Sequence, residues 1–346
     1  MSIVFAGGGT VGPLTSVLNI AKKVHTYDEN ISLHFVAPKK SAGKEMVEKE
    51  GISWHEITST KLHRYVSVSN LFIPLKIVIG FIQAYRLLKK IDAKVIVTSG
   101  GFVSPPVVWA GKLLRAHTIL IQLDVRPGLA NKLMKGFSDK IYVSWESHLK
   151  TFKNAELVGL PLQETVNKEK LPFTLPEGKK LVTIVGGGTG AAAINKLVSE
   201  SVHNLTKHAF IAHSTGKGKL NKDCNSENYF QFEFGEEWYQ TLIASSDIVV
   251  SRAGMGALAD YIFHGAATII IPIPNSHQVD NANMLKVRGA AVVLNQNELN
   301  SKSFAKHIIS TISNEDLINK LKKKMSGLKV KNGVEIMAEE ILRLYG

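Results

Sequence analysis

Two glycine-rich turns are the residues of this chain best suited to chemistry, because each follows an apolar run and precedes an amphipathic one. The first spans residues 7–12 (Gly-Gly-Gly-Thr-Val-Gly) and the second spans residues 186–191 (Gly-Gly-Gly-Thr-Gly-Ala). Glycine lets backbone N–H groups approach an oxyanion closely, and a helix N-terminus adds a favourable dipole. Both turns therefore predict phosphate sites. One such turn is a weak signal, but two in similar settings indicate two doubly wound domains facing a shared cleft.

The spacing of these glycines also fits the dinucleotide pattern Gly-x-Gly-x-x-Gly, with Ala in the last place of the second turn. A nicotinamide or flavin enzyme also needs a carboxylate near the end of the second strand to hold ribose hydroxyls. At the equivalent places the chain has Ala-Pro-Lys-Lys at 37–40 and Ser-Thr-Gly-Lys at 214–217. A dinucleotide oxidoreductase is therefore disfavoured, although the lysines would suit a 2′-phosphate.

Apolar runs alternate with amphipathic segments along the chain, which is typical of βαβ units around parallel sheets. The expected fold class is α/β, with two Rossmann-like, doubly wound parallel-sheet domains. We expect strands at 3–6, 32–36, 95–98, 118–121 and 140–143 in the first half and at 181–185, 209–213, 229–232, 248–251, 268–271 and 291–294 in the second.

The domain boundaries follow from the same pattern, since 346 residues exceed the usual size of one domain. Residues 1–158 would form the first domain, 159–180 a linker with three prolines, and 181–332 the second domain. Residues 333–346 have apolar side chains at helical spacing, and we expect this helix to pack back on the first domain.

Composition limits the class of protein. Cys224 is the only cysteine, which excludes an internal disulfide and a cysteine-based metal cluster and favours a reducing compartment. The N-terminus lacks the pattern of a signal peptide, so we expect none. The net charge of +13 is uneven: residues 1–158 hold 21 Lys and Arg against 11 Asp and Glu, and residues 159–346 hold 21 against 18. A basic first half suits an anionic surface or a phosphorylated substrate, although solubility alone would also explain it.

The segment at 71–91 is unusually apolar and basic. On a helix Lys76, Gln83 and Lys90 fall seven apart and form a narrow stripe beside a wide apolar face. The uninterrupted apolar length is too short to span a membrane. The segment is therefore either a helix lying in the interface of an anionic membrane or a core helix, and one face could pack inward while the other meets lipid.

The remaining glycine and polar turns form an ordered set that resembles the MurG family of peptidoglycan N-acetylglucosaminyltransferases. The resemblance runs from Ile3 to the last helix. The matching motifs are Ser-Gly-Gly-Phe-Val-Ser-Pro at 99–105, Pro-Gly-Leu-Ala-Asn-Lys at 127–132, the turn at 186–191 with Asn195, Ser-Thr-Gly-Lys-Gly at 214–218, Asp-Ile-Val-Val-Ser-Arg-Ala-Gly at 247–254 and His-Gln-Val-Asp-Asn-Ala at 277–282.

The resemblance implies the two-domain GT-B fold and a defined reaction. The second domain would bind UDP-N-acetylglucosamine, and the first would hold undecaprenyl-diphospho-N-acetylmuramoyl-pentapeptide at the cytoplasmic face of the plasma membrane. The family forms a β-1,4 bond with inversion and needs no catalytic metal or cofactor. The partners would be these two substrates and an anionic membrane surface, with no nucleic acid, and the protein would be peripheral to the membrane.

The resemblance also implies roles in the second domain. The turn that opens the helix at residue 254 would present amides to the diphosphate. Asp260 stands where the family has a glutamate that binds the ribose hydroxyls, and Gln278 would bond donor-sugar hydroxyls because an amide both donates and accepts. The expected donor-site residues are Gly187, Gly188, Thr189, Gly190, Phe234, Gly235, Gly254, Met255, Gly256, Ala257, Leu258, Asp260, Gln278 and Gln163.

In the first domain the chain departs from the family. The family histidine after the first turn is replaced by Pro13, which cannot transfer a proton, and the arginine of the linker turn appears as Gln163. The family His-Glu-Gln-Asn after the fourth strand is Ile-Gln-Leu-Asp at 121–124. The resemblance places the acceptor diphosphate beside Gly9, Thr10, Gly12, Gly100, Gly101 and Gln122.

These departures suggest a role for Asp124. An inverting transfer needs a base to take the proton of the attacking hydroxyl. Asp124 is the one carboxylate among the first-domain motif residues, so we predict that it is the catalytic base or shares this work with groups of the bound acceptor. The alternative is that Asp124 caps the helix that begins near Pro127.

Two other functions stay open from the sequence. Another GT-B transferase could use a different sugar nucleotide or lipid. A sugar-nucleotide- or lipid-binding pseudoenzyme scaffold would explain Pro13, Gln122 and Gln163, although a scaffold has no need of a donor site.

Overall fold

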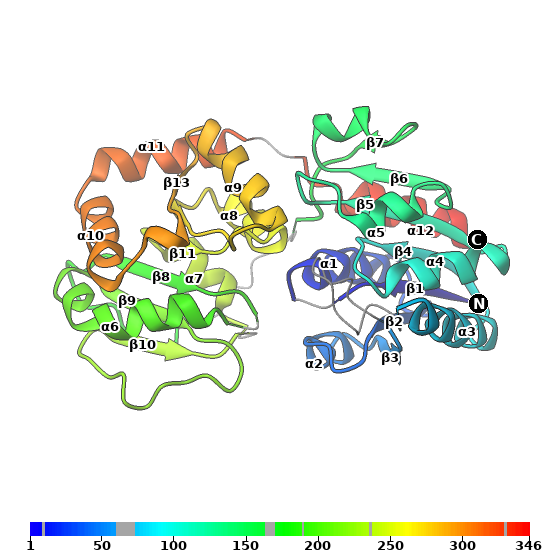
Figure 1. Ribbon diagram of the computed structural model, residues 1–346, viewed down its shortest axis with the longest axis horizontal. Helices are drawn as coiled ribbons and strands as arrows, with labels where there is room; N and C mark the ends of the chain where they lie inside the picture. The colour runs from blue at the N-terminus through cyan, green and yellow to red at the C-terminus, as the bar shows by residue number, and fades with distance from the viewer. Residues whose placement is uncertain (9–10, 60–72, 163–169, 189, 235–236, 329–330) are drawn as a thin grey trace. The chain divides into compact units, whose positions relative to one another are not determined.

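The computed structural model describes residues 1–8, 11–59, 73–162, 170–188, 190–234, 237–328 and 331–346, and omits the side chains of residues 11–13. The chain divides into two compact units (Figure 1). Unit 1 comprises Met1–Leu162 and Val330–Gly346, and unit 2 comprises Gln163–Lys329. Residues 159–162 of the expected linker thus belong to unit 1, where Leu160 forms a parallel bridge with Asn332.

Unit 1 is built on a seven-stranded sheet with the order β3-β2-β1-β4-β5-β6-β7 and parallel pairings. Its first strand is buried at every residue, and such continuous apolar runs form strands that are covered on both faces. The strands are β1 (Ser2–Ala6), β2 (Ser32–Pro38), β3 (Ser53–Ile57), β4 (Ala93–Thr98), β5 (His117–Gln122), β6 (Lys140–Val143) and β7 (Glu156–Leu157).

Helices and the 3-10 turn η2 connect and cover these strands. The C-terminal helix α12 packs against α1, and its Glu335 and Glu340 lie 3.9 and 3.6 Å from the ammonium groups of Lys23 and Lys140. These elements are α1 (Val11–Tyr27), α2 (Lys44–Glu48), α3 (Ile73–Lys90), α4 (Ser104–Leu113), α5 (Leu129–Met134), η2 (Glu146–Lys150) and α12 (Val334–Tyr345).

Unit 2 repeats the plan with a six-stranded parallel sheet of order β10-β9-β8-β11-β12-β13. Its core joins these strands to α6 and α10 through buried aliphatic side chains. The strands are β8 (Leu181–Val185), β9 (Phe210–Ser214), β10 (Tyr229–Phe232), β11 (Ile248–Ser251), β12 (Thr268–Ile270) and β13 (Ala291–Val293). The helical elements are α6 (Ala192–His208), α7 (Tyr239–Ser245), α8 (Met255–His264), α9 (His277–Val287), η3 (Gln296–Glu298), α10 (Ser301–Ile312) and α11 (Glu315–Ser326).

The expected strands therefore all occur, and the structure adds β3 and β7. The sequence of β3 is Ser-Trp-His-Glu-Ile, and β7 has two exposed residues. Neither carries the apolar run by which the other strands were predicted, and both lie at edges of the sheet.

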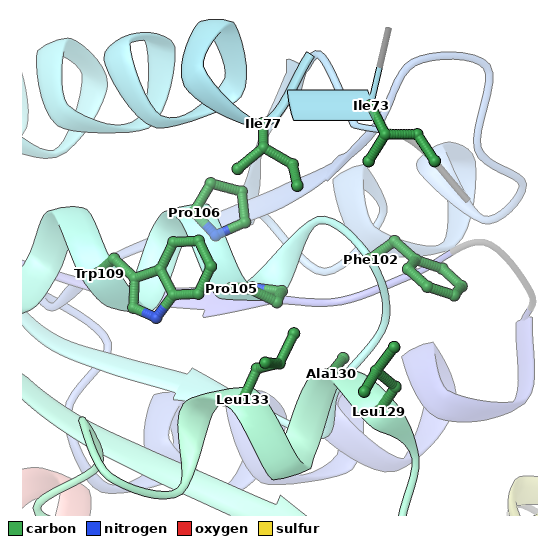
Figure 2. A pocket seen from close by; sticks show the side chains of 9 residues that line it. All are labelled: Ile73, Ile77, Phe102, Pro105, Pro106, Trp109, Leu129, Ala130 and Leu133. Carbon is green, nitrogen blue, oxygen red and sulfur yellow. The ribbon is translucent and has the colours of Figure 1, made fainter. Parts of the chain in front are cut away.

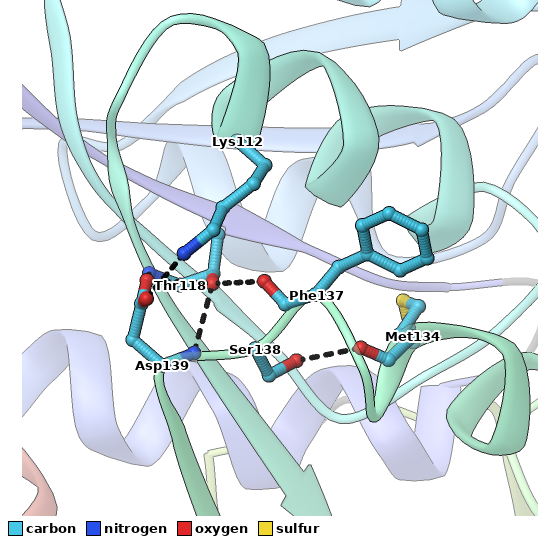
Figure 3. A network of polar contacts seen from close by, with 6 residues as sticks. All are labelled: Lys112, Thr118, Met134, Phe137, Ser138 and Asp139. Atoms are coloured by element: carbon cyan, nitrogen blue, oxygen red, sulfur yellow. Dashed lines mark hydrogen bonds and ion pairs between the residues drawn. The ribbon is translucent and has the colours of Figure 1, made fainter.

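A polar network fastens α4 to the start of β5 and β6 (Figure 3). Asp139 Oδ2 accepts a bond of 2.9 Å from the Thr118 backbone N–H, Asp139 Oδ1 is paired with Lys112, and Thr118 Oγ1 donates to the Phe137 carbonyl. Burial alone would raise the pKa of Asp139, but the bonds from Lys112 and Thr118 outweigh burial and lower the pKa. The charged carboxylate thus stabilises this end of the sheet.

Candidate active site

The glycine turn of unit 2 follows β8, at the carboxyl end of the parallel sheet. Gly187 and Gly190 have positive φ of 88° and 71°, a region that favours glycine. A Cβ on Gly190 would overlap the Thr215 carbonyl oxygen, so the turn needs glycine to pack against the loop after β9. The turn leads into α6, whose first residues receive no side-chain cap. Gly188 is partly exposed beside it, whereas Thr189 lies outside the described residues.

A second helix begins at the same edge, after β11. The N-cap of α8 is Gly254 and makes no side-chain cap bond to the first N–H groups of the helix. Asn281 of α9 is fully buried and donates to the Ala253 carbonyl at 2.9 Å, which fixes the turn in front of α8. Such an N-terminus is a ready anion site. The residues of the first turn are Met255, Gly256, Ala257 and Leu258.

Gln278 of α9 has a defined orientation. Its Oε1 atom accepts from the backbone N–H of Ala253 at 3.3 Å and of Ile273 at 3.1 Å. Two N–H donors identify this atom as the oxygen. The Nε2 atom lies 3.9 Å from where a Cβ on Gly254 would stand. The amide therefore presents its donor to the N-terminus of α8, whereas the sequence had suggested that it would both donate and accept.

Asp260 lies one turn further along α8, near the start of α7. Its side chain is partly exposed, but the packing around it is close enough that burial raises its pKa to about 7, against which a hydrogen bond from Gln240 acts. The Oε1 atom of Gln240 is 2.8 Å from Nε2 of His264, which donates to it. Asp260 also contributes to the raised pKa of Tyr239, whose ring lies 5.2 Å from that of Phe234.

In unit 2, Phe234 and Asp260 both lie next to Tyr239 and so form one region. Gly254 and Gln278 form a second region at the start of α8. Both regions lie along α8. Gly235 and Gln163 lie outside the described residues.

In unit 1 the turns after β1, β4 and β5 meet. Gly100 and Gly101 have φ of 106° and 96°. A Cβ on Gly101 would stand 3.0 Å from the Gly8 carbonyl oxygen, and one on Gly100 would overlap Asn131 Oδ1. Backbone and amide groups therefore crowd this edge, where glycine is required. Gly9 and Thr10 lie outside the described residues, and Gly12 falls in the first turn of α1.

Asp124 is partly exposed in the turn between β5 and α5. The N-cap residue of α5 is Gly128, so Asp124 is not the N-cap residue of this helix. The nearby Gln122 is 1% exposed, and its Nε2 donates to the Asp124 carbonyl at 2.6 Å while its Oε1 accepts from Asn131 at 2.7 Å. Gln122 therefore contacts the turn of Asp124 rather than solvent.

No role was predicted for Asn131, Trp145 or His148, although all three contact this turn or its supports. Asn131 stood within the quoted motif at 127–132. No motif in the sequence pointed to Trp145 or His148, because both follow the next strand, β6, and lie far along the chain from Asp124.

The exposed face of α3 and its neighbours is apolar. Leu75, Val78, Ile79 and Ile82 are 38–58% exposed, while Gly80, Ala84 and Leu88 face the core. One side of α3 therefore packs on the core and the other is exposed. This is the combination that the sequence allowed when it left open a core helix and a helix in a membrane interface. Next to it the side chains of α3, α4 and α5 converge on an apolar pocket (Figure 2). Its lining residues are Ile73, Ile77, Phe102, Pro105, Pro106, Trp109, Leu129, Ala130 and Leu133.

Within the described ranges, none of the helices combines the length and apolar character needed to cross a bilayer. Those ranges also hold no cluster of three or more His, Cys, Asp or Glu side chains placed to bind a metal ion.

Comparisons with known proteins cover almost the whole chain. The glycosyltransferase family 28 N-terminal domain matches residues 3–143, and the family 28 C-terminal domain matches residues 181–337. A relative from Bacillus cereus (strain ATCC 10987 / NRS 248) is 34% identical over 337 residues, which are 94% of this chain and 95% of the relative. The chain belongs to glycosyltransferase family 28.

The Bacillus cereus protein is named UDP-N-acetylglucosamine--N-acetylmuramyl-(pentapeptide) pyrophosphoryl-undecaprenol N-acetylglucosamine transferase 2. A relative from Clostridium tetani, named as the same transferase without the number, is 30% identical over an alignment of 355 positions that covers 99% of this chain and 98% of the relative.

Among solved structures, Acinetobacter baumannii MurG has a TM-score of 0.71 at 18% identity and covers 99% of both chains. The glycotransferase of kitacinnamycin has a TM-score of 0.73 at 13% identity and covers 100% of this chain and 99% of its own. The predicted family and the predicted GT-B type of fold are confirmed, and this family 28 member is a glycosyltransferase.

Proposed function

We propose that this family 28 protein transfers N-acetylglucosamine from UDP-N-acetylglucosamine to undecaprenyl-diphospho-N-acetylmuramoyl-pentapeptide. The observation that carries the proposal is the likeness to transferases named for this reaction over nearly the full length of both chains. The geometry of unit 2 supports it, because an uncapped helix N-terminus, an oriented amide and a partly exposed carboxyl group suit a nucleoside diphosphate sugar.

In the donor site, the amides at the start of α8 and the glycine turn at 186–191 bind the diphosphate. Gln278 donates through Nε2 to a sugar or phosphate oxygen, and Asp260 accepts from the ribose hydroxyls. The backbone of Phe234 and Gly235 meets the uracil. Thr189 and Gln163 complete the expected set.

In the acceptor site, the turns at 8–12 and 100–101 hold the acceptor diphosphate. Asp124 takes the proton of the attacking hydroxyl as its oxygen bonds to the anomeric carbon. The bond from that carbon to the phosphate oxygen breaks, and UDP leaves with the electron pair and is stabilised by the α8 amides. The configuration inverts because attack and departure are on opposite faces of the sugar. Gln122 is buried and bonded within the fold, so its role is to hold the turn of Asp124.

The exposed face of α3 meets the cytoplasmic face of the plasma membrane. Its open apolar side chains stand beside Lys76, Arg86, Lys89 and Lys90, and the apolar pocket of α3, α4 and α5 continues this surface. An apolar helix face with flanking cations suits the interface of an anionic bilayer. The protein is then peripheral to the membrane, where its lipid-linked acceptor resides.

Transfer of radiolabelled N-acetylglucosamine to a short-chain polyprenyl-diphospho-muramoyl-pentapeptide tests the activity. We expect turnover with UDP-N-acetylglucosamine, and a rise in melting temperature with this nucleotide but not with NADH. Binding of the nucleotide without transfer or hydrolysis would favour a scaffold, and transfer of a different sugar would favour another GT-B enzyme.

For the base, Asp124→Asn should lower kcat by about 10²–10⁴-fold. Near-full turnover of this variant would eliminate the role of Asp124.

For the membrane surface, Ile79→Glu should reduce sedimentation with vesicles that contain phosphatidylglycerol and leave transfer to a soluble acceptor unchanged. Thr26→Glu, which adds the same negative charge at an exposed position of α1 in the same unit, is the control. Equal binding of Ile79→Glu and the unaltered protein would contradict this surface.

A further inference from the structure

The turn that carries Asp124 is held by side chains at three successive backbone carbonyls. Trp145 Nε1 donates to the Leu123 carbonyl at 2.8 Å. Gln122 Nε2 donates to the Asp124 carbonyl at 2.6 Å, and His148 Nε2 lies 3.1 Å from the Val125 carbonyl, to which it donates. We call the side chains of Gln122, Trp145 and His148 the turn clamp.

The clamp comes from the interior of unit 1. Gln122 and His148 are each 1% exposed and Trp145 is 9% exposed, whereas Asp124 itself is partly open to solvent. Loop carbonyls usually bond to water, and interior donors fix them more firmly because the donors cannot move without disturbing the core.

The donors are themselves anchored. Asn131 Nδ2 donates to Gln122 Oε1 at 2.7 Å, and Asn131 lies against Gly100 in the neighbouring turn. Ser144 Oγ donates to the Gly159 carbonyl at 2.9 Å, which holds the segment that leads to Trp145 and η2. The clamp therefore connects Asp124 to the turn after β4 and to the segment after β6.

His148 contacts this turn through one defined donor atom, Nε2. Because a carbonyl accepts from Nε2, this nitrogen carries the hydrogen. Burial lowers the pKa of His148, and the Val125 and Asp124 groups that oppose burial do not overcome it. In the described part of the chain Nδ1 has no hydrogen-bond partner, and the ring stands edge-on to Phe152 at 6.4 Å. The buried His148 ring thus acts as a fixed donor.

From this geometry we propose that His148 and Trp145 are positioning residues for the reaction, which hold the backbone of Asp124 so that its carboxylate meets the acceptor hydroxyl. The inference rests on the proposed function, in which Asp124 is the base. A base must be held to within a fraction of an ångström, and a displacement of about 1 Å costs on the order of 10²-fold in rate. Three fixed carbonyls on consecutive residues provide this restraint without a regular element.

The test compares a variant that loses the donor with one that keeps it. His148→Leu removes Nε2–H, and we expect kcat to fall by about 10–100-fold while KM for both substrates changes by less than about 3-fold. His148→Gln places an amide N–H at the position of Nε2, and we expect kcat within about 3-fold of the unaltered enzyme. Trp145→Phe removes the other donor but keeps an aromatic ring, and we expect a loss of about 3–10-fold.

Phe152→Leu is the matched control, because Phe152 is 1% exposed and contacts the His148 ring without bonding to the turn. We expect it to lower stability but to leave kcat per folded molecule unchanged. Equal loss in His148→Leu, His148→Gln and Phe152→Leu would reduce His148 to a packing role and overturn the proposal.

A double-mutant cycle separates this inference from the role of Asp124. If the clamp acts through Asp124, then Asp124→Asn and the double variant Asp124→Asn/His148→Leu have the same kcat. An additive loss overturns the clamp. Should Asp124→Asn lose activity while His148→Leu and Trp145→Phe keep it, the clamp fails and the base stands. Full activity of Asp124→Asn ends the proposed base and the clamp together. Amide exchange at 124–126 should quicken in His148→Leu but not in His148→Gln.

Discussion

Replacing Asp260 by asparagine is expected to stabilise unit 2 and weaken nucleotide binding at the same time. Burial raises the pKa of this carboxyl group from 3.8 to about 7. Between pH 3.8 and about pH 7 the folded protein therefore keeps the carboxyl proton, whereas the unfolded chain releases it. Stability therefore falls as pH rises from 3.8 to about 7, and the whole cost is present above pH 7. The neutral amide of Asp260→Asn carries no such cost.

The magnitude follows from the shift. Three pKa units correspond to about 4 kcal/mol at about 1.4 kcal/mol per unit. Because the Asp260 side chain is partly exposed, solvent reduces this, and we expect a gain of about 2 kcal/mol for Asp260→Asn at about pH 8. At about pH 3 the two proteins should differ by less than about 0.5 kcal/mol, since the carboxyl group is then largely protonated in both states.

Hydrogen exchange of β8 and β11 amides, followed by mass spectrometry, reports the stability of unit 2 by itself. The exposed Asp223→Asn in the same unit is the control and should show no pH-dependent gain. A stability difference between Asp260→Asn and the unaltered protein that stays constant from about pH 4 to about pH 8 would refute the burial argument.

The same variant tests the ribose contact. A charged carboxylate that accepts from hydroxyls contributes about 1.5–3 kcal/mol, so Asp260→Asn should weaken UDP binding by about 10–100-fold at about pH 8. In the unaltered protein, UDP affinity should decline below about pH 7 as the carboxylate is protonated. Calorimetric affinities that match at about pH 8 would show that Asp260 does not bind the nucleotide, whatever its pKa.

Other residues yield independent predictions. Burial lowers the pKa of His213 to about 4, so its contribution to the free energy of unfolding should be fully present above pH 6.5. As the pH drops toward 4 this free energy should fall by up to about 3 kcal/mol. Urea unfolding should show no such loss in His213→Gln. Gly80→Ala should cost about 1–3 kcal/mol in the same assay, because a Cβ would overlap the Thr58 carbonyl oxygen, whereas Ala84→Gly on the inner face of α3 should cost only about 1 kcal/mol. Gln278→Met should raise KM for UDP-N-acetylglucosamine by about 10-fold or more, since the Nε2 donor is lost and two backbone N–H groups lose their acceptor, and an unchanged KM would contradict the donor role of Gln278.

Much of the fold could be predicted because its signals are local. The apolar runs of β1 and β8 and the glycine turns that follow them are readable over about ten residues, since a buried parallel strand needs continuous apolar side chains. The family resemblance rested on the same turns. The edge strands β3 and β7 escaped prediction because β3 reads Ser-Trp-His-Glu-Ile and β7 has two exposed residues, so neither shows such an apolar run.

The sequence named candidate site residues but could not give the surroundings that set their chemistry. The sequence placed Asp260 in a motif, but only packing against α7 and the bond from Gln240 set its pKa near neutrality. Gln278 was expected to donate and accept, and the fold committed its oxygen to two backbone N–H groups.

The sequence by itself determined which residues form the sheets and turns of this glycosyltransferase and which carboxyl groups could act. The tertiary structure decided what surrounds them: Trp145 and His148 reach the turn of Asp124 from a segment more than twenty residues along the chain. Such contacts depend on which strands become neighbours in the sheet, and no local pattern of residues encodes that pairing.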